Sequence, residues 1–391
     1  MKLLILASLL IFILLILVLL QICQIESLDR FWEDVRKLIL ILLLLLFGCY
    51  AEVAKEEIEK IDEVDLVLGN SDKIRIKEIL ENNEAQYAQQ RNEYCEFGSV
   101  TYTEKTRAVI KVQDGCNQFC SYCIIPYARG RIRSRSRESV LEEITGLADK
   151  GFKEVVITGI HVASYGKDLN NNYFLIDLLE DINKINGIER IRLGSLEPTL
   201  ITDKFVERIT KLEKICHHFH LSLQSGCDKI LKNMNRKYTT EDFENVTKRL
   251  RSVFGDVILT TDVIVGFPGE SDEDFEITYD FLKRIKFYKM HVFKYSPRKG
   301  TVAAKMDNQI SSDIKEKRSK ALIELSDLNE REYLQEYIGK SVDVLFEERD
   351  GDFIKGHTQN YILVKKDGNA EINSIESVDI INIGKDFLMG K

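Results

Sequence analysis

The sequence predicts an α/β protein whose main part is a six-stranded α/β barrel followed by a small antiparallel β-barrel. From Thr106 onward, six short β-branched runs alternate with longer stretches of helical periodicity. From about residue 338 the pattern changes to short alternating segments broken by Gly, Asp and Asn. The chain has 391 residues, which is enough for two or three domains with a real apolar core.

The barrel prediction rests on the order of its elements. The six strand-like runs are "TRAVIKV", "EVVITGI", "RIRLGSL", "HFHLSLQ", "VILTTDVIVGF" and "KMHVFKYS". Helical stretches such as "ESVLEEITGLADK" and "DEDFEITYDFLKRIK" separate them, and a charged helix is expected over roughly 312–337. Strands that are each followed by a helix pair in parallel through right-handed crossovers, so they form an open or closed barrel. The chemistry of such a barrel lies at the carboxyl ends of its strands.

The chain divides into four expected parts. An apolar N-terminus covers 1–48, and 49–95 reads as the remainder of a first α/β domain. The six-stranded barrel covers 100–337, and the small β-barrel covers 338–391. Its expected strands are "SVDVLFEE", "DFIKGHT", "YILVKK" and "SVDIINI".

The N-terminus is unlike the rest of the chain. Leu3–Leu20 holds 18 residues without a charge or a helix breaker, and Leu38–Phe47 is a shorter apolar run. Three interpretations stay open. We favour a damaged or frameshifted stretch, because the Leu/Ile composition differs from the charged chain after Ala51. A membrane anchor fits the length of the first run, whereas a signal peptide lacks its small-residue cleavage site.

Composition limits the functional classes. The net charge of −8 gives no global reason to expect nucleic-acid binding, so such a function would need local basic patches. Eight cysteines are too scattered for a secreted disulfide framework. We therefore expect a reduced, cytoplasmic location, with clustered cysteines kept for metal binding or chemistry.

Three of these cysteines form a tight motif after the first predicted strand. Cys116, Cys120 and Cys123 follow the pattern C-x3-C-x2-C. Structural zinc needs four closed ligands, usually in paired C-x2-C units, and a ferredoxin-type cluster needs four cysteines. Three thiolates on a four-iron cluster leave one iron without a protein ligand, which is useful only if another molecule binds there. Zinc and incidental thiols remain the alternatives.

The motif resembles that of the radical S-adenosylmethionine (SAM) superfamily. More narrowly, "DGCNQFCSYCIIPYARGRIRSR" is similar to the methylthiotransferases. One branch, the threonylcarbamoyladenosine tRNA methylthiotransferases, is similar in "TGIHVASYG", "LSLQSGCDKILKNMNRKYT", "TTDVIVGFPGESDEDF" and "HVFKYSPRKGTVAAKM". The final barrel resembles a TRAM domain down to "GHTQNYILV". The resemblance covers about 49–391.

The resemblance implies a fold, an activity and partners. The fold would be a partial (β/α)6 radical SAM barrel, preceded by a truncated or aberrant α/β methylthiotransferase domain and followed by a TRAM-like barrel. The activity would be conversion of N6-threonylcarbamoyladenosine at tRNA position 37 to its 2-methylthio derivative. It would use a [4Fe–4S] cluster, SAM, a one-electron reductant of flavodoxin or ferredoxin type and a sulfur donor. The alternatives are a methylthiotransferase for isopentenyladenosine tRNA or a ribosomal protein, and an iron–sulfur or RNA-binding remnant unable to insert sulfur.

The resemblance also implies site residues. The cluster that generates the radical would be bound by Cys116, Cys120 and Cys123. The expected cofactor-binding residues at the strand ends are Tyr122, Gly159, Glu197, Gln224, Arg236 and Gly266. Glu197 could hold ribose hydroxyls, and Arg236 could pair with the cofactor carboxylate. The alternative for the strand-end residues is a simple role in turns. For Arg236 the alternative is a surface ion pair.

A second cluster is implied for the N-terminal domain of the family, where three cysteines deliver sulfur. Cys49, in "GCYA", matches the third of these cysteines. Cys23 is a candidate for the second, although its spacing to Cys49 is shorter than usual. The first has no counterpart in this chain, and two thiolates are a poor ligand set for a stable cluster.

An arginine row and an aromatic residue suggest contacts with nucleic acid. Arg129, Arg131, Arg133, Arg135 and Arg137 alternate with other residues and would share one face of an extended segment. Phosphate contact is the favoured interpretation, and pairing with the following glutamates is the alternative. In the C-terminal barrel Tyr361 could stack on a base. "CHHFH" (216–220) would put His218 and His220 on one face of a strand and His217 on the other, which indicates packing or substrate contact rather than a metal site.

Overall fold

The structure is a computed structural model that describes residues 49–61, 64, 67–70, 72, 79, 94, 96, 106–368 and 370–391. The chain forms two compact units, 1–89 and 90–391. The apolar runs Leu3–Leu20 and Leu38–Phe47, together with Cys23 and Cys95, lie outside the described residues. Within the described part, every helix is too short or too polar to cross a membrane.

Little of the first unit is described. It contains the short helices α3 (Cys49–Val53) and α4 (Lys55–Ile58). Ala51 and Ile58 are buried against Val67 in a small apolar cluster. The strand and second helix predicted downstream lie mostly among residues that the structure does not describe.

Six parallel strands form the main part of the second unit. They are β1 (Arg107–Asp114), β3 (Glu154–Gly159), β4 (Arg190–Leu193), β5 (His218–Gln224), β6 (Ile258–Val265) and β7 (Lys289–Lys294). They pair in chain order as β1–β3–β4 and β5–β6–β7. Two isolated parallel bridges, Ile191 with Ile215 and Leu196 with Leu221, join the two groups. Short β2 (Arg133–Ser134) pairs antiparallel with β1. The predicted partial six-stranded barrel is confirmed.

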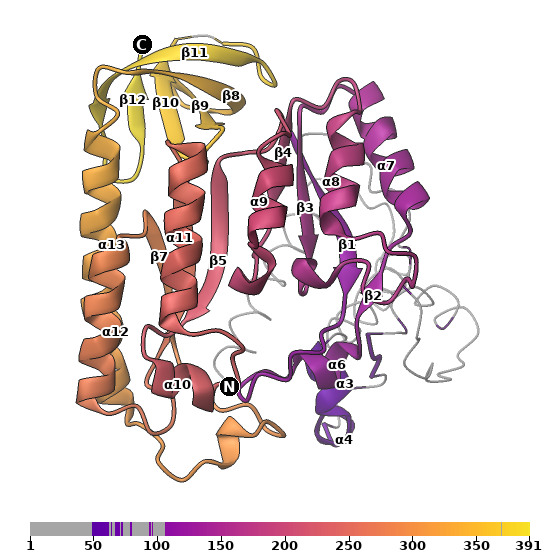
Figure 1. Ribbon diagram of the computed structural model, residues 1–391, viewed down its shortest axis with the longest axis vertical. Helices are drawn as coiled ribbons and strands as arrows, with labels where there is room; N and C mark the ends of the chain where they lie inside the picture. Colours follow the sequence, from indigo (N-terminus) through magenta and orange to yellow (C-terminus); the bar gives the residue numbers. More distant parts are fainter. Residues whose placement is uncertain are drawn as a thin grey trace, which may run out of the picture. The chain divides into compact units, whose positions relative to one another are not determined.

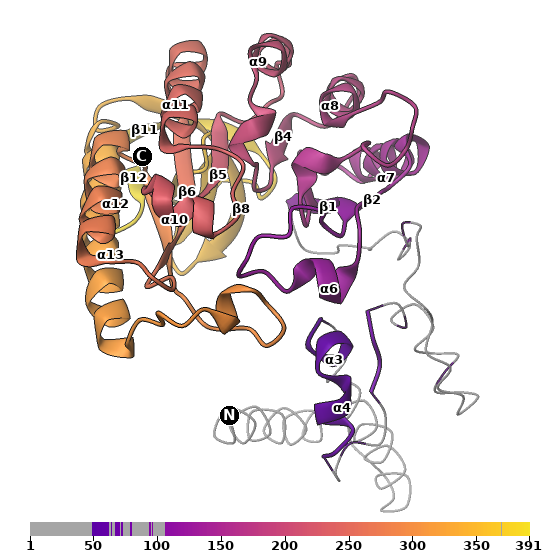
Figure 2. The same cartoon turned by 60° about the horizontal axis from the view of Figure 1, so that its bottom comes forward.

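Helices cover the outer face of these strands (Figures 1 and 2). They are α7 (Arg137–Asp149), α8 (Leu175–Asn183), α9 (Asp203–Ile209), α11 (Thr240–Phe254), α12 (Asp272–Ile285) and α13 (Ser312–Gln335). Short α6 (Ile125–Arg129) and α10 (Asp228–Asn233) lie at the carboxyl ends of the strands. A large apolar core joins strands and helices, and fully buried members include Ile110, Ile144 and Phe219. Ser and Thr side chains cap several helix starts, as Ser271 does for α12.

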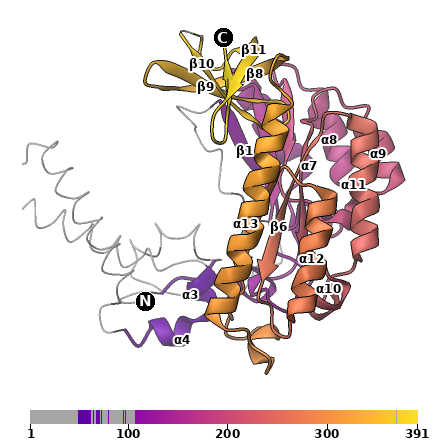
Figure 3. The same cartoon turned by 90° about the vertical axis from the view of Figure 1, so that its left-hand side faces the viewer.

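The C-terminal segment forms a closed five-stranded barrel at one end of α13 (Figure 3). Its strands are β8 (Ser341–Asp350), β9 (Phe353–Thr358), β10 (Leu363–Asp367), β11 (Ile375–Ile383) and β12 (Leu388–Gly390). Phe346, Val364 and Leu388 belong to its separate apolar core. The pairing is antiparallel except between β10 and β12, which are parallel and close the barrel. The predicted barrel is therefore confirmed, with β12 as a strand that the sequence did not reveal.

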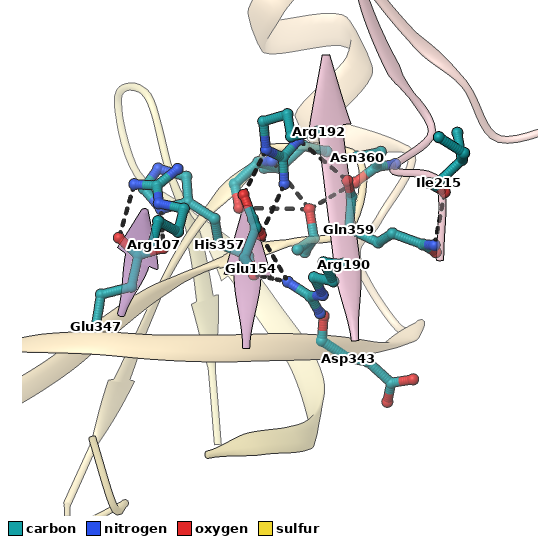
Figure 4. Close-up of polar contacts among 12 residues, drawn as sticks. Arg107, Glu154, Arg190, Arg192, Ile215, Asp343, Glu347, His357, Gln359 and Asn360 are labelled. Atoms are coloured by element: carbon teal, nitrogen blue, oxygen red, sulfur yellow. Dashed lines mark hydrogen bonds and ion pairs between the residues drawn. The ribbon is translucent and has the colours of Figure 1, made fainter. Parts of the chain in front are cut away.

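Two arginines of β4, paired with a buried glutamate, bind this barrel to the parallel strands (Figure 4). Glu154 opens β3 and is fully buried, and Arg192 in β4 donates to both of its carboxylate oxygens at 2.7 and 3.2 Å. Arg192 also donates to the Gln359 carbonyl at 3.2 Å. Neighbouring Arg190 donates to the carbonyls of His357 and Asp343 at 2.8 and 3.0 Å. The two arginines thus satisfy buried carbonyls of the C-terminal barrel and fix its position.

Tyr361, which the sequence predicts to stack on a base, lies beside this interface and is 38% exposed. Its backbone has a φ of 74°. The ring stacks on His218 and His357 at centroid distances of 5.1 and 4.8 Å. The Arg192 guanidinium lies 4.5 Å from the same centroid. The ring thus has protein neighbours on the interface side, and base stacking by its exposed part stays a prediction.

The three histidines of "CHHFH" have different neighbours, as the strand alternation predicts. His218 and His220 both contact the Thr260 hydroxyl at 3.0 Å, whereas His217 packs on Phe254. Burial, with a further contribution from Arg192, holds the pKa of His218 well below its usual range. His218 is therefore a neutral, packed residue.

Acidification is expected to destabilise the fold through His218. The folded chain keeps this imidazole neutral while the unfolded chain protonates it below about pH 6.5, so below that pH the unfolded state binds more protons. One such group lowers the free energy of unfolding by up to about 1.4 kcal/mol per pH unit. Urea unfolding at pH 7.5 and 5.5 tests this, with His218→Leu expected to lose less stability on acidification than the wild type. An equal loss in both proteins would contradict it.

Candidate active site at the cysteine loop

The three-cysteine loop begins where β1 ends. Gly115 leaves the strand with a φ of 71°, and the Cys116 amide donates to the Gly130 carbonyl at 3.1 Å. Ser121 is bonded through its amide to the Met234 carbonyl and through its own carbonyl to the Ala303 amide. The loop is therefore anchored by segments that follow β5 and β7. All three cysteines are only half-buried.

Gly115 is a position where only glycine fits. An added Cβ would lie 1.8 Å from the Arg131 carbonyl oxygen, and its φ is unfavourable for other residues. Gly115→Ala is expected to cost at least about 2 kcal/mol and to prevent normal metal loading. Gly146, inside α7, has open space where an added Cβ would lie, so Gly146→Ala is the matched control and should stabilise by about 1 kcal/mol. Thermal unfolding and iron content after reconstitution measure both effects. A Gly115→Ala protein that behaves like the wild type would contradict this account.

The three thiols of the loop are not arranged around a single metal ion. Within the described residues, no three His, Cys, Asp or Glu side chains converge on a point that could hold one metal ion. A four-iron cluster makes a different demand, because each iron takes one thiolate. Burial raises the pKa of the Cys116 thiol and raises that of Cys123 to about 11. Metal binding must therefore displace protons from these sulfurs.

Glu197 is the centre of a buried polar network beside the loop. It follows β4, and its side chain is only 3% exposed. Gln118 and His161 each donate to Oε2 at 2.8 Å. Oε1 has no hydrogen bond, although an Arg236 nitrogen lies 3.5 Å away. Burial alone would raise the pKa of Glu197, but His161 and Arg236 outweigh it and lower the pKa. The carboxylate is charged, with one oxygen left as an acceptor.

Arg236 connects this carboxylate to the cysteines. Its side chain is 8% exposed, and Nη1 donates to Cys120 Sγ at 3.3 Å. Nε donates to the Tyr238 hydroxyl at 2.9 Å, and Nη2 donates to the Ser222 carbonyl at 3.3 Å. The ion pair of Arg236 is thus buried, and the surface ion pair considered as an alternative is wrong.

The remaining predicted cofactor-binding residues lie in the cysteine loop or at the carboxyl ends of the strands. Tyr122 packs edge-on against Phe267 at a centroid distance of 6.5 Å, and Gln224 is buried with a φ of 72°. The two glycines make room for protein side chains. A Cβ on Gly159 would lie 2.9 Å from Gln113 Oε1, and one on Gly266 would lie 2.2 Å from the Lys315 side chain.

The arginine row does not form the single extended face that its alternation predicted. Arg129 ends helix α6, and Gly130 then turns the chain with a φ of 80°. Only two residues form strand β2, and Arg137 already begins helix α7. The five guanidinium groups therefore leave the backbone in several directions.

Four members of this row pair with carboxylates. Arg129 and Arg133 both pair with Asp114, at 3.3 and 3.5 Å. Arg135 is buried and pairs with Glu96 and Glu143. Arg137 pairs with Asp181 at 2.7 Å. In contrast, Arg131 is exposed, and its guanidinium lies 4.6 Å from the Phe119 ring centroid.

Cys49 belongs to the first unit. It opens α3, and its sulfur lies 3.7 Å from the Asn70 side-chain nitrogen, which donates to it. The Asn70 amide in turn donates to Glu52 at 2.7 Å. The turn that holds Cys49 is thus ordered by local contacts.

Comparison with known proteins places the chain in a family. Residues 110–282 match the radical SAM superfamily. Threonylcarbamoyladenosine tRNA methylthiotransferase MtaB of Bacillus subtilis (strain 168) is 38% identical over 362 residues, covering 88% of this chain and 79% of that protein. The chain belongs to the radical SAM methylthiotransferase family. The MtaB protein of Aquifex aeolicus (strain VF5) is 41% identical over 343 residues, covering 85% of this chain and 81% of that protein. A tRNA-2-methylthio-N(6)-dimethylallyladenosine synthase of Alkaliphilus oremlandii (strain OhILAs) is 39% identical over 339 residues, with coverages of 83% and 72%.

Membership of the radical SAM methylthiotransferase family has direct consequences. The chain is an enzyme of that class, as the sequence motifs predicted. The family implies a [4Fe–4S] cluster and SAM as cofactors. Sequence reasoning missed two residues of the site, Gln118 and His161. Their sequence positions were a usable signal, since Gln118 stands between two motif cysteines and His161 stands in "TGIHVASYG".

Proposed function

We propose that this radical SAM methylthiotransferase converts N6-threonylcarbamoyladenosine at tRNA position 37 to its 2-methylthio derivative. The observation that carries the proposal is the buried Glu197–Arg236 pair beside three half-buried cysteines in one loop. The relatives from Bacillus and Aquifex, which carry this activity in their names, support the choice of substrate.

The side chains present fit the implied cofactors. Cys116, Cys120 and Cys123 would hold the cluster, and no other described thiol of this unit is placed to be a fourth ligand. Cys216 is buried, and Cys227 directs its sulfur to Asp274 at 3.6 Å. Glu197 Oε1 is a buried acceptor without a donor, which suits a hydroxyl-bearing ligand. When bound, the cluster and SAM supply the electron and the carbon-centred radical that activate a carbon–hydrogen bond.

The polar residues around the loop would bind and orient the ligand. Arg236 places a buried positive charge 3.3 Å from Cys120 Sγ, to which it donates a hydrogen bond. Its charge could also pair with a ligand carboxylate. Glu197 would accept from ribose hydroxyls through Oε1. Tyr122, Gly159, Gln224 and Gly266 would shape the backbone around the same ligand, and the half-buried loop would limit access of water.

A second candidate substrate is isopentenyladenosine in tRNA. The Alkaliphilus relative supports this candidate, because its name describes a synthase of the corresponding methylthio nucleoside. In either case the partner would be a tRNA. Arg131 would be the member of the arginine row that contacts phosphate, because it is exposed while Arg135 is buried and paired.

Sulfur insertion would need a second cluster in the first unit. Cys49 would be one ligand and Cys23 another, and a sulfur donor would supply the inserted atom. Iron content distinguishes the cases, since one [4Fe–4S] cluster gives about four irons per chain and two give about eight. We also propose that a one-electron reductant of flavodoxin or ferredoxin type serves the enzyme and that its location is cytoplasmic.

Nucleoside analysis of tRNA from a strain lacking this gene tests the function. The 2-methylthio derivative of threonylcarbamoyladenosine should disappear and its unmodified precursor should accumulate. A gene copy carrying Cys216→Ala should restore the modification, whereas one carrying Cys116→Ala should not. Loss of the methylthio derivative of isopentenyladenosine instead would establish the second candidate, and unchanged tRNA would refute both.

A further inference from the structure

His161 stands in a motif, "TGIHVASYG", that the proposed function leaves without a role. It follows β3, and its side chain is 13% exposed. Its Nε2 lies 2.8 Å from Glu197 Oε2, which follows the next strand. Its Nδ1 is bonded to the hydroxyl of Ser164, a residue only 2% exposed in the short helix η2 (Val162–Ser164). Both ring nitrogens are therefore used inside the protein.

These two contacts select one tautomer. A carboxylate only accepts, so Nε2 must carry the proton that bonds to Glu197. Nδ1 of the neutral ring is then an acceptor, and the Ser164 hydroxyl donates to it. Ser164 thus acts on Glu197 through His161, because its bond to Nδ1 holds the ring with Nε2 facing the carboxylate.

The backbone of His161 is tied to the cysteine loop as well. Its amide donates to Gln113 Oε1 at 2.8 Å, and the fully buried Gln113 donates from Nε2 to the Gly115 carbonyl at 2.7 Å. From within the loop, Gln118 donates to the same Glu197 oxygen that His161 contacts. The ends of β1, β3 and β4 are therefore joined by a continuous set of hydrogen bonds that meets at Glu197.

We propose that His161 is a positioning residue that, with its ring held by Ser164, holds Glu197 so that Oε1 stays available to the ligand. The contacts explain why the two oxygens of this carboxylate differ: Oε2 has two protein donors, and Oε1 has no hydrogen bond. Without His161 the carboxylate could rotate toward Arg236 and close the ion pair that now measures 3.5 Å. The inference rests on the proposed function for the identity of the ligand, SAM.

A double-mutant cycle on SAM affinity tests whether His161 acts through Glu197. Equilibrium dialysis without reductant gives the Kd for anaerobically reconstituted wild type, His161→Leu, Glu197→Gln and the double variant. His161→Leu should raise the Kd about tenfold, the expected effect of losing a buried hydrogen bond to a charged group. The double variant should match Glu197→Gln alone. His161→Gln, whose amide nitrogen can replace Nε2 as a donor, should restore most of the affinity.

Two results would overturn the proposal. If His161→Leu weakens binding by the same factor with and without Glu197, the residue does not act through the carboxylate. The second readout needs no cofactor: ¹⁵N spectra of the histidines in the metal-free chain, assigned with His161→Gln, should show the Nε2–H tautomer for His161. An Nδ1–H tautomer would refute the contact. Wild-type protein that binds no SAM would instead refute the proposed function, and the tautomer would still decide the role of His161.

Discussion

Replacing Cys116, Cys120 or Cys123 by alanine is expected to reduce cleavage of SAM to the background level of unreduced protein. Each substitution leaves two thiols in the loop, which is a poor ligand set for a four-iron cluster. The measurement is 5′-deoxyadenosine formed per chain after anaerobic reconstitution and reduction with dithionite.

The matched control for these variants is Cys216→Ala. Cys216 is buried just before β5, and burial raises the pKa of its thiol to about 12, so it is a packed, protonated residue. This variant should load iron and form 5′-deoxyadenosine like the wild type. A Cys116→Ala protein that forms as much product as Cys216→Ala would show that the loop does not hold the reactive cluster.

Arg192→Leu is expected to lower the free energy of unfolding by about 3–5 kcal/mol, because it leaves the fully buried Glu154 carboxylate without its main partner. The same change removes the donor from the Gln359 carbonyl, so the C-terminal barrel should also lose protection. Urea unfolding measures the first effect. Amide hydrogen exchange in β8 and β9 measures the second.

Two further variants separate the buried charge from simple loss of packing. Glu154→Leu with Arg192→Leu removes both charges and should recover much of the lost stability. Lys211→Met breaks an exposed ion pair with Glu207, and it should change stability by less than about 1 kcal/mol. If Arg192→Leu costs no more than Lys211→Met, the ion pair does not hold the two barrels together.

The sequence was sufficient for the features that depend on local pattern. Six β-branched runs predicted the six parallel strands, because alternating strands and helices leave few other topologies. The spacing of Cys116, Cys120 and Cys123 identified the loop, and its place after the first strand put it at the carboxyl end. The charged helix predicted over 312–337 corresponds to α13.

The features that depend on contacts between distant segments could not be predicted. His161 and Glu197 are 36 residues apart in sequence, and only the packing of neighbouring strand ends brings their side chains together. The arginine row alternates like a strand, but Pro126 opens a helix and Gly130 breaks the direction of the chain. The sequence context of Tyr361 likewise does not reveal that its ring stacks on His218, a residue distant from it in the sequence.

Electron paramagnetic resonance of the reduced protein, with and without SAM, tests the central claim most directly. A [4Fe–4S] cluster held by three thiolates has one iron open to the ligand, so the reduced protein should give a cluster signal whose g values shift when SAM is added. Cys116→Ala should lack the shifted signal. A wild-type protein with no cluster signal, or with one that SAM leaves unchanged, would contradict the account.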